Sequence, residues 1–161
     1  MKNVVINHYK TGKIETLDDA LAYFNSMVSL NPLPSITVFN HVLSSTSKIG
    51  CYSDEKIQSA AKMFDEMIKR GVQPNIITCD TIITGLCRVG ELDNALELLR
   101  NMTRWNCKAT ILCSLIITAL CKSGLVDEAL DLFSEMVDVP KIAPDVVVYT
   151  SLIMGCAILT G

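Results

Sequence analysis

The sequence is poor in the residues from which catalytic and metal sites are built. It contains two histidines and one tryptophan. It has no CxxC pair, and neither His8 nor His41 lies near two cysteines at zinc-ligand spacing. It also lacks a glycine-rich phosphate loop and any cluster of carboxylates beyond the solvated faces of predicted helices. The sequence therefore predicts a protein that is not an enzyme and that holds neither a metal ion nor another cofactor.

A disulfide framework is absent as well, although the chain has seven cysteines. The count is odd, and the spacing follows a repeat, because Cys79 and Cys113 are 34 positions apart, as are Cys87 and Cys121. Cysteines placed once per repeat are typical of small core residues. A chain without disulfides suits a reducing compartment. We therefore expect these cysteines to be structural, with free thiols.

Long uncharged segments are missing too. Residues 109–121 and 146–161 carry no charge, but each is shorter than the about 20 apolar residues that a membrane-spanning helix needs. Residues 1–20 contain lysines and acidic residues, but neither arginine nor the apolar core of a signal peptide. The sequence thus predicts buried helices, no membrane span and no transit peptide within this chain.

The chain also has no excess of positive charge. Its net charge is −3 and its pI is about 5.3, which argues against strong binding of nucleic acid. Hydrophobic residues make up 50% of the chain, and the mean hydropathy is +0.36. This composition suits a protein with many internal apolar faces and little outer surface.

The most informative feature that is present is an internal repeat. Residues 81–102 (TIITGLCRVGELDNALELLRNM) recur 34 positions later as residues 115–136 (LIITALCKSGLVDEALDLFSEM), and half of the aligned positions are identical. A period between about 20 and 50 residues is typical of stacked repeat arrays. In such arrays each unit buries its apolar face against its neighbours. The sequence therefore predicts an all-α solenoid of helix-turn-helix units.

Apolar stripes, caps and breakers set the unit boundaries. Thr16 precedes a stripe at helical spacing and predicts a helix start, while Gly71 and Pro74 end a later helix. Gly90 and Gly124 separate the two helices of their units. The predicted helices are residues 36–48, 76–88, 92–103, 110–122, 125–137 and 146–158. The predicted units are residues 1–35 (a partial repeat, second helix about 16–30), 36–75 (a repeat with an insertion), 76–109, 110–145 and 146–161 (a truncated repeat with its first helix only).

The units resemble one family of helical hairpins. A tetratricopeptide unit would carry Trp and Leu-Gly in its first helix, and these first helices lack both. Unit ends GVQPN and IAPD, with GLCRVGELDNALELL between them, resemble the pentatricopeptide repeat (PPR) family of the pure 35-residue P type. The opening PLPSITVFNHVL and the GLC and ALC runs resemble its restorer-of-fertility-like subgroup of plant organellar proteins. The resemblance extends from about Thr16 and implies a right-handed α-α superhelix.

This resemblance implies sequence-specific binding of single-stranded RNA, with one base per repeat and the first helices lining an inner groove. The expected role is organellar RNA processing, RNA stability or translation, in the mitochondrion or alternatively the plastid. In the family, a first-helix polar residue and the last residue of the unit recognise each base. The first-helix residues here would be Asn40, Asp80, Ser114 and Thr150, and the last residues Asn75 (with Asn40), Asp145 (with Ser114) and Thr110, or Ala109 by strict count (with Asp80).

Family analogy gives the Asn40–Asn75 pair a pyrimidine and the Ser114–Asp145 pair a guanine, and it gives no base to Asp80. Two further sets transfer by position. Four residues would sandwich the bases, or else form ordinary core: Thr37, Ile77, Ile111 and Val147. Three cations would contact phosphates, or else stabilise helix C-termini: Lys48, Arg88 and Lys122.

Three phosphate contacts would give a salt slope of only about −2 on a single strand, so we expect weak RNA binding. The alternative function is that of a protein-binding scaffold like the tetratricopeptide arrays. That function would need a groove lined by charged or hydrophobic anchors in place of short polar side chains. Residues 146–161 would also leave an uncovered apolar face, which predicts self-association through this end.

Overall fold

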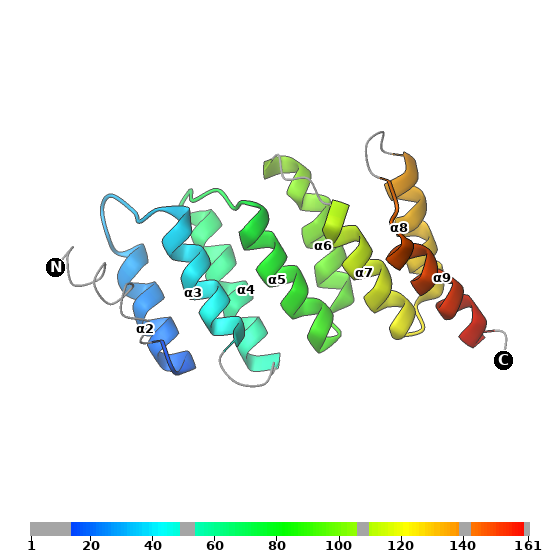
Figure 1. The fold of residues 1–161 in the computed structure, drawn as a ribbon. Helices are drawn as coiled ribbons and strands as arrows, with labels where there is room; N and C mark the ends of the chain where they lie inside the picture. The colour runs from blue at the N-terminus through cyan, green and yellow to red at the C-terminus, as the bar shows by residue number, and fades with distance from the viewer. Residues whose placement is uncertain (1–13, 49–53, 106–109, 139–142, 160–161) are drawn as a thin grey trace. The chain divides into compact units, whose positions relative to one another are not determined.

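The computed structural model describes residues 14–48, 54–105, 110–138 and 143–159. Over these residues the secondary structure is entirely helical, with no strand, which confirms the predicted all-α class (Figure 1). The first helices of the predicted units are α3 (Ile36–Lys48), α5 (Ile76–Val89), α7 (Thr110–Lys122) and α9 (Val146–Leu159). The second helices are α2 (Leu17–Val28), α4 (Asp54–Lys69), α6 (Leu92–Asn101) and α8 (Val126–Asp138), and the 3-10 turn η1 (Met102–Trp105) follows α6.

The helix starts follow from local hydrogen bonding. Thr16 caps α2 as predicted: its side chain accepts from the Asp19 N–H at 3.1 Å, and the Asp19 carboxylate accepts from the Thr16 N–H at 3.1 Å. This reciprocal capping box satisfies two backbone donors that a helix start otherwise leaves unpaired. It also holds the pKa of Asp19 below its ordinary value, chiefly through the Thr16 side chain.

Three glycines provide the predicted helix ends. Gly71, Gly90 and Gly124 have φ angles of 83°, 83° and 78°, in the left-handed region that other residues enter only at a cost. Two predicted ends were too long. α2 stops at Val28, two residues before the predicted end, and α6 stops at Asn101 and continues as η1. The reason in α6 is a tightened last turn, because the Met102 N–H donates to both Leu98 O and Leu99 O.

The chain divides into two compact units, Met1–Gly85 and Leu86–Gly161. In the first unit, α3 packs against α2 and α4. Phe24 of α2 meets Phe39 of α3 edge to face, with ring centroids 5.9 Å apart. Phe39 and Leu43 of α3 and Met67 of α4 are fully buried in this core. Each helix therefore covers an apolar face that it could not bury alone.

In the second unit, α7 packs against α6, α8 and α9. Ile116, Ile117 and Leu120 of α7 are fully buried. Phe133 of α8 meets Tyr149 of α9 with ring centroids 5.7 Å apart. α7 is thus the central helix of this unit.

The predicted core cysteines are free thiols. Cys79, Cys113 and Cys121 are buried, and Cys87 is half-buried. Burial raises the pKa of Cys87 to about 11, so its thiol stays protonated and unreactive at neutral pH. No described helix has both the length and the apolar character that crossing a membrane requires.

Candidate nucleic-acid interface

The structure brings one predicted base-recognition pair into direct contact. Asn40, in α3, donates through Nδ2 to Oδ1 of Asn75 at 3.1 Å, across 35 positions of sequence. Asn40 is only 7% exposed, whereas Asn75 is half-buried. The Asn40 side chain is therefore held in a fixed position by its neighbours, and the more accessible part of the pair belongs to Asn75.

Asn75 has a second role, because it also starts α5. Its backbone carbonyl accepts from the Cys79 N–H at 3.1 Å, and its side-chain Oδ1 accepts from the Thr78 N–H at 3.1 Å. The Asn75 N–H in turn donates to Thr78 Oγ1 at 3.1 Å. This is a capping box with Asn and Thr in the two reciprocal positions. One carboxamide thus joins the start of α5 to the predicted recognition residue of α3.

Sequence reasoning missed Thr78, which completes this cluster. Its side chain is 0% exposed, and its hydroxyl lies 2.6 Å from Asn40 Oδ1 and 3.0 Å from Asn75 Oδ1. The third positions of α7 and α9 hold the buried apolar residues Leu112 and Val148. A threonine where equivalent units place aliphatic residues was the available signal.

The Ser114–Asp145 pair is arranged differently. Asp145 starts α9 as Asn75 starts α5: its Oδ1 accepts from the Val148 N–H at 3.0 Å. Ser114 is half-buried in α7. Within residues 110–138 and 143–159, no direct hydrogen bond joins the Ser114 and Asp145 side chains, in contrast to the two asparagines.

The other two first-helix residues are exposed. The Asp80 carboxylate accepts from Thr84 Oγ1 at 3.4 Å. Thr150 Oγ1 donates to the Val146 carbonyl of its own helix at 2.7 Å. The side chain of Thr110 and the whole of Ala109 lie outside the described residues, so the predicted partner of Asp80 is not placed.

The predicted base-sandwiching residues lie on the surface where the structure describes them. Ile77 is 56% exposed and Val147 is 53% exposed, and Thr37 is also exposed. The alternative interpretation, ordinary core, is therefore wrong for Ile77 and Val147. The Ile111 side chain lies outside the described residues. Exposed aliphatic side chains beside short polar ones can contact a flat apolar base.

Two of the three predicted phosphate contacts are described, and both are exposed cations near helix C-termini. Arg88 and Lys122 are in the last turns of α5 and α7. The Lys48 side chain lies outside the described residues. Acidic side chains are exposed on second helices, where Glu135 of α8 pairs with Arg100 of α6 at 3.1 Å. Within the described ranges, no group of three or more His, Cys, Asp and Glu residues could hold a metal ion.

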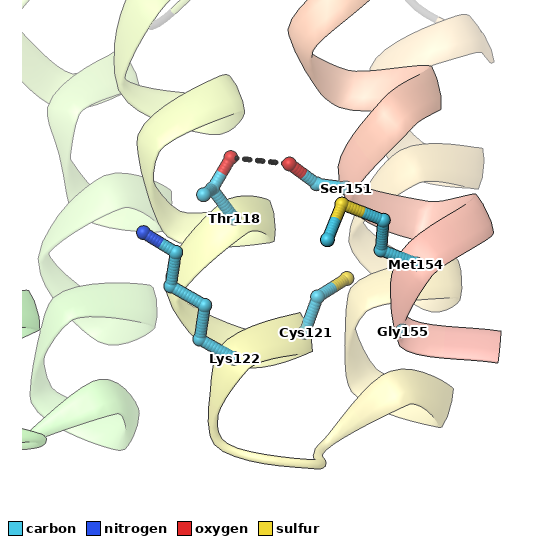
Figure 2. Close-up of a pocket in the computed structure, with 6 residues that line it drawn as sticks. All are labelled: Thr118, Cys121, Lys122, Ser151, Met154 and Gly155. Carbon is cyan, nitrogen blue, oxygen red and sulfur yellow. Dashed lines mark hydrogen bonds between the residues drawn. The ribbon is translucent and has the colours of Figure 1, made fainter. Parts of the chain in front are cut away.

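Hydroxyl pairs between first helices were also missed. Ser44 of α3 lies 3.3 Å from Thr81 of α5, and Thr118 of α7 lies 2.9 Å from Ser151 of α9 (Figure 2). Both pairs join the ninth residue of one first helix to the sixth residue of the next. Beside the second pair, a small cavity of about 90 Å³ is lined by Thr118, Cys121, Lys122, Ser151, Met154 and Gly155 (Figure 2).

Curated relatives are similar to part of this chain. It is 35% identical over 86 residues to pentatricopeptide repeat-containing protein At5g16640, mitochondrial, of Arabidopsis thaliana, a match that covers 53% of this chain and 16% of that protein. It is also 35% identical over 83 residues to pentatricopeptide repeat-containing protein At2g16880 of the same plant, covering 52% of this chain and 11% of that protein. The chain thus spans a small part of the length of these relatives.

Solved structures share the fold. The pentatricopeptide repeat protein PPR10 in complex with an 18-nt psaJ RNA element superposes with a TM-score of 0.61 at 24% identity, covering 92% of this chain and 21% of that chain. PPR10 from maize gives a TM-score of 0.52 at 20% identity, covering 86% of this chain and 24% of that chain. The model of the PPR repeat family matches residues 34–88, 74–113 and 109–158. Because these matches cover most of its length, the chain belongs to the PPR repeat family.

Proposed function

We propose that this chain binds single-stranded RNA in a sequence-specific manner, with one base recognised per repeat. Family membership supports RNA as the ligand, and PPR10, which shares the fold, is solved with an RNA element bound. The observation that carries the proposal is the hydrogen bond of 3.1 Å between Asn40 and Asn75. It joins the two residues that, by analogy with the family, would recognise one base.

The surroundings of this pair fit a base. Ile77 follows Asn75 by two positions and is 56% exposed, which provides an apolar contact near a polar pair. Base stacking on aromatic side chains is worth about 1–3 kcal/mol per base, and aliphatic contacts supply part of that. The predicted phosphate contacts Lys48, Arg88 and Lys122 would together give a shallow salt slope of about −2.

We further propose that the protein acts on organellar transcripts, in processing, stability or translation. The name of one relative places that relative in the mitochondrion, and this supports a mitochondrial location for this protein, with the plastid as the alternative. The P type is proposed from the unit ends GVQPN and IAPD, and the restorer-of-fertility-like subgroup from the opening PLPSITVFNHVL and the GLC and ALC runs. The proposal of an RNA ligand does not depend on these finer assignments.

The test is selection of bound RNA from a random pool. We expect the parent protein to enrich a pyrimidine two places from a guanine, as the pairs Asn40–Asn75 and Ser114–Asp145 predict. The Asn40→Ala/Ser114→Ala variant should lose this enrichment and weaken binding by about tenfold, because each lost hydrogen bond contributes about 0.5–1.5 kcal/mol. Affinity is measured by fluorescence anisotropy on the enriched RNA.

The matched control is the Asn94→Ala/Ser134→Ala variant. It removes the same side-chain types from exposed positions of the second helices α6 and α8, and it should bind like the parent. Equal binding of every RNA by the parent and by the Asn40→Ala/Ser114→Ala variant would contradict the proposal. It would favour a protein-binding scaffold instead.

A further inference from the structure

In the cluster of Asn40, Asn75 and Thr78, both carboxamide oxygens accept hydrogen bonds from groups of the protein itself. Asn75 Oδ1 accepts from Asn40 Nδ2 at 3.1 Å and from the Thr78 N–H at 3.1 Å. Asn40 Oδ1 accepts from Thr78 Oγ1 at 2.6 Å. Both carboxamide oxygens are therefore engaged inside the protein. The groups that these bonds leave over are amide N–H donors: the second hydrogen of Asn40 Nδ2 and both hydrogens of Asn75 Nδ2.

A carboxamide can turn by 180° with little change of shape, which exchanges its donor and acceptor. Two features oppose such a turn here. The Thr78 N–H needs the Asn75 oxygen to cap α5, and the Thr78 hydroxyl, through its one proton, can donate to the oxygen of Asn40. Thr78 contributes both, and it is fully buried. The orientation of the two amides therefore depends on this one side chain and its backbone.

We propose that Thr78 is a positioning residue for base recognition: it fixes both carboxamides so that the Asn40–Asn75 pair presents N–H donors to the base. The pair then selects a base edge that offers acceptor atoms. This inference rests on the proposed function and deepens it, because it assigns specificity at one RNA position to a residue that itself does not reach the base.

The start of α9 provides a comparison in which no hydroxyl is present. Val148 occupies the position of Thr78 in α9 and has no hydroxyl, and Asp145 has two equivalent oxygens, so no orientation needs to be fixed there. The hydroxyl of Thr78 lies in the first helix that follows the unit whose recognition pair consists of two amides. The first helix that follows the unit ending in the carboxylate of Asp145 has Val148, without a hydroxyl, at the same position.

The experiment uses the RNA enriched by the parent protein, with the base opposite the Asn40 unit replaced by each of the four bases. Thr78→Val keeps the side-chain shape and removes the hydroxyl. We expect it to reduce discrimination among the four bases by about 2- to 13-fold, the ratio that one hydrogen bond produces. Discrimination at the position opposite Ser114 should not change. Thr78→Ser, which retains the hydroxyl, should restore the parent behaviour.

The control is Thr46→Val in α3. Thr46 is also fully buried, and its hydroxyl donates to the Val42 carbonyl at 2.9 Å, away from the asparagine pair. Removing it should leave base discrimination unchanged. If Thr78 only caps α5, Thr78→Val will instead weaken binding to all four RNAs equally and lower thermal stability. That result would overturn the inference.

A second readout needs no RNA. In the parent protein, the Asn40 side-chain amide protons should exchange with solvent more slowly than those of exposed Asn94, measured by NMR. Equal exchange would overturn the inference even if Thr78→Val failed to fold. A parent protein that binds no RNA refutes the proposed function and this inference together. A parent that discriminates bases and a Thr78→Val variant that discriminates equally well refute the inference alone.

Discussion

Replacing Asn40 by aspartate tests the geometry of the paired amides. The substitution preserves shape but exchanges Nδ2 for an oxygen, which then faces Asn75 Oδ1 across the 3.1 Å that the native hydrogen bond spans. Asn75 cannot turn its amide without uncapping α5 at the Thr78 N–H. At neutral pH, two acceptors therefore face each other at a site where the native side chain is only 7% exposed.

The magnitude follows from the lost bond and the burial. Removing one partner of a buried hydrogen bond costs about 1–3 kcal/mol, and the Thr78 hydroxyl at 2.6 Å offsets part of the added charge. Burial and the opposing oxygen both disfavour the charged form, so the pKa of the introduced carboxyl rises above its ordinary value of about 3.9. In the folded state the carboxyl then stays protonated at low pH and donates to Asn75 Oδ1. Stability relative to the parent is retained near pH 4 and lost as the pH rises through the raised pKa.

The assay is thermal unfolding by circular dichroism at pH 4 and pH 7, expressed as variant minus parent at each pH. We expect a deficit of about 2–12 °C at pH 7, since 1 kcal/mol shifts the midpoint by about 2–4 °C at this chain length. The deficit should be much smaller at pH 4. Asp80→Asn is the matched control, because it exchanges the same two groups at the equivalent exposed position and should change the midpoint little. A deficit that is the same at both pH values would refute the reasoning.

Three further predictions concern single features. Gly124→Ala should destabilise the protein by about 1–2 kcal/mol because φ is 78°; no atom lies within 4 Å of an added Cβ, so the loss comes from the backbone angle and not from a clash. Gly124→Asn should destabilise it less. Equal losses of stability for the two variants in urea unfolding would contradict this backbone origin. Burial raises the pKa of Cys87 to about 11, so its thiol should react with a maleimide at pH 8 much more slowly than that of exposed Cys156. Peptide mass spectrometry measures the two rates, and comparable rates would argue against the burial of Cys87. Val146 and Ile153 of α9 are 78% and 69% exposed, so we expect concentration-dependent self-association of the parent protein. Light scattering should show that the Val146→Lys/Ile153→Lys variant no longer associates. A parent that stays monomeric at high concentration would exclude this prediction.

Much of the fold could be predicted because each local signal agreed with the next. The repeat offset, the apolar stripes and the glycine breakers all favoured helical hairpins. The bounds of α3 and α7 coincide with the predicted ranges. The end of α6 could not be predicted, because the choice between an α turn and the 3-10 turn at Met102 depends on which carbonyl is nearer, Leu98 O or Leu99 O. Residue type does not encode this choice of acceptor.

The candidate site was predictable in part. The resemblance named Asn40 and Asn75, and the structure places them in contact. It gave no indication that Asn40 would be nearly buried or that Thr78 would bond to it, since both facts depend on how α3 and the start of α5 pack. The sequence also could not decide whether Ile77 is exposed, as it is in the structure, because an isoleucine at helical spacing is as typical of a core as of a surface contact.

The shared oxygen of Asn75 limits how this repeat could be reprogrammed. A residue that must begin a helix has to be short and carry an acceptor, which leaves asparagine, aspartate, serine and threonine as good choices. Exchanging Asn75 to obtain a different target nucleotide is therefore restricted to about four residue types. Any other residue type at this position would leave the first turn of α5 without its side-chain cap. The defect would appear as reduced stability before it appeared as altered specificity.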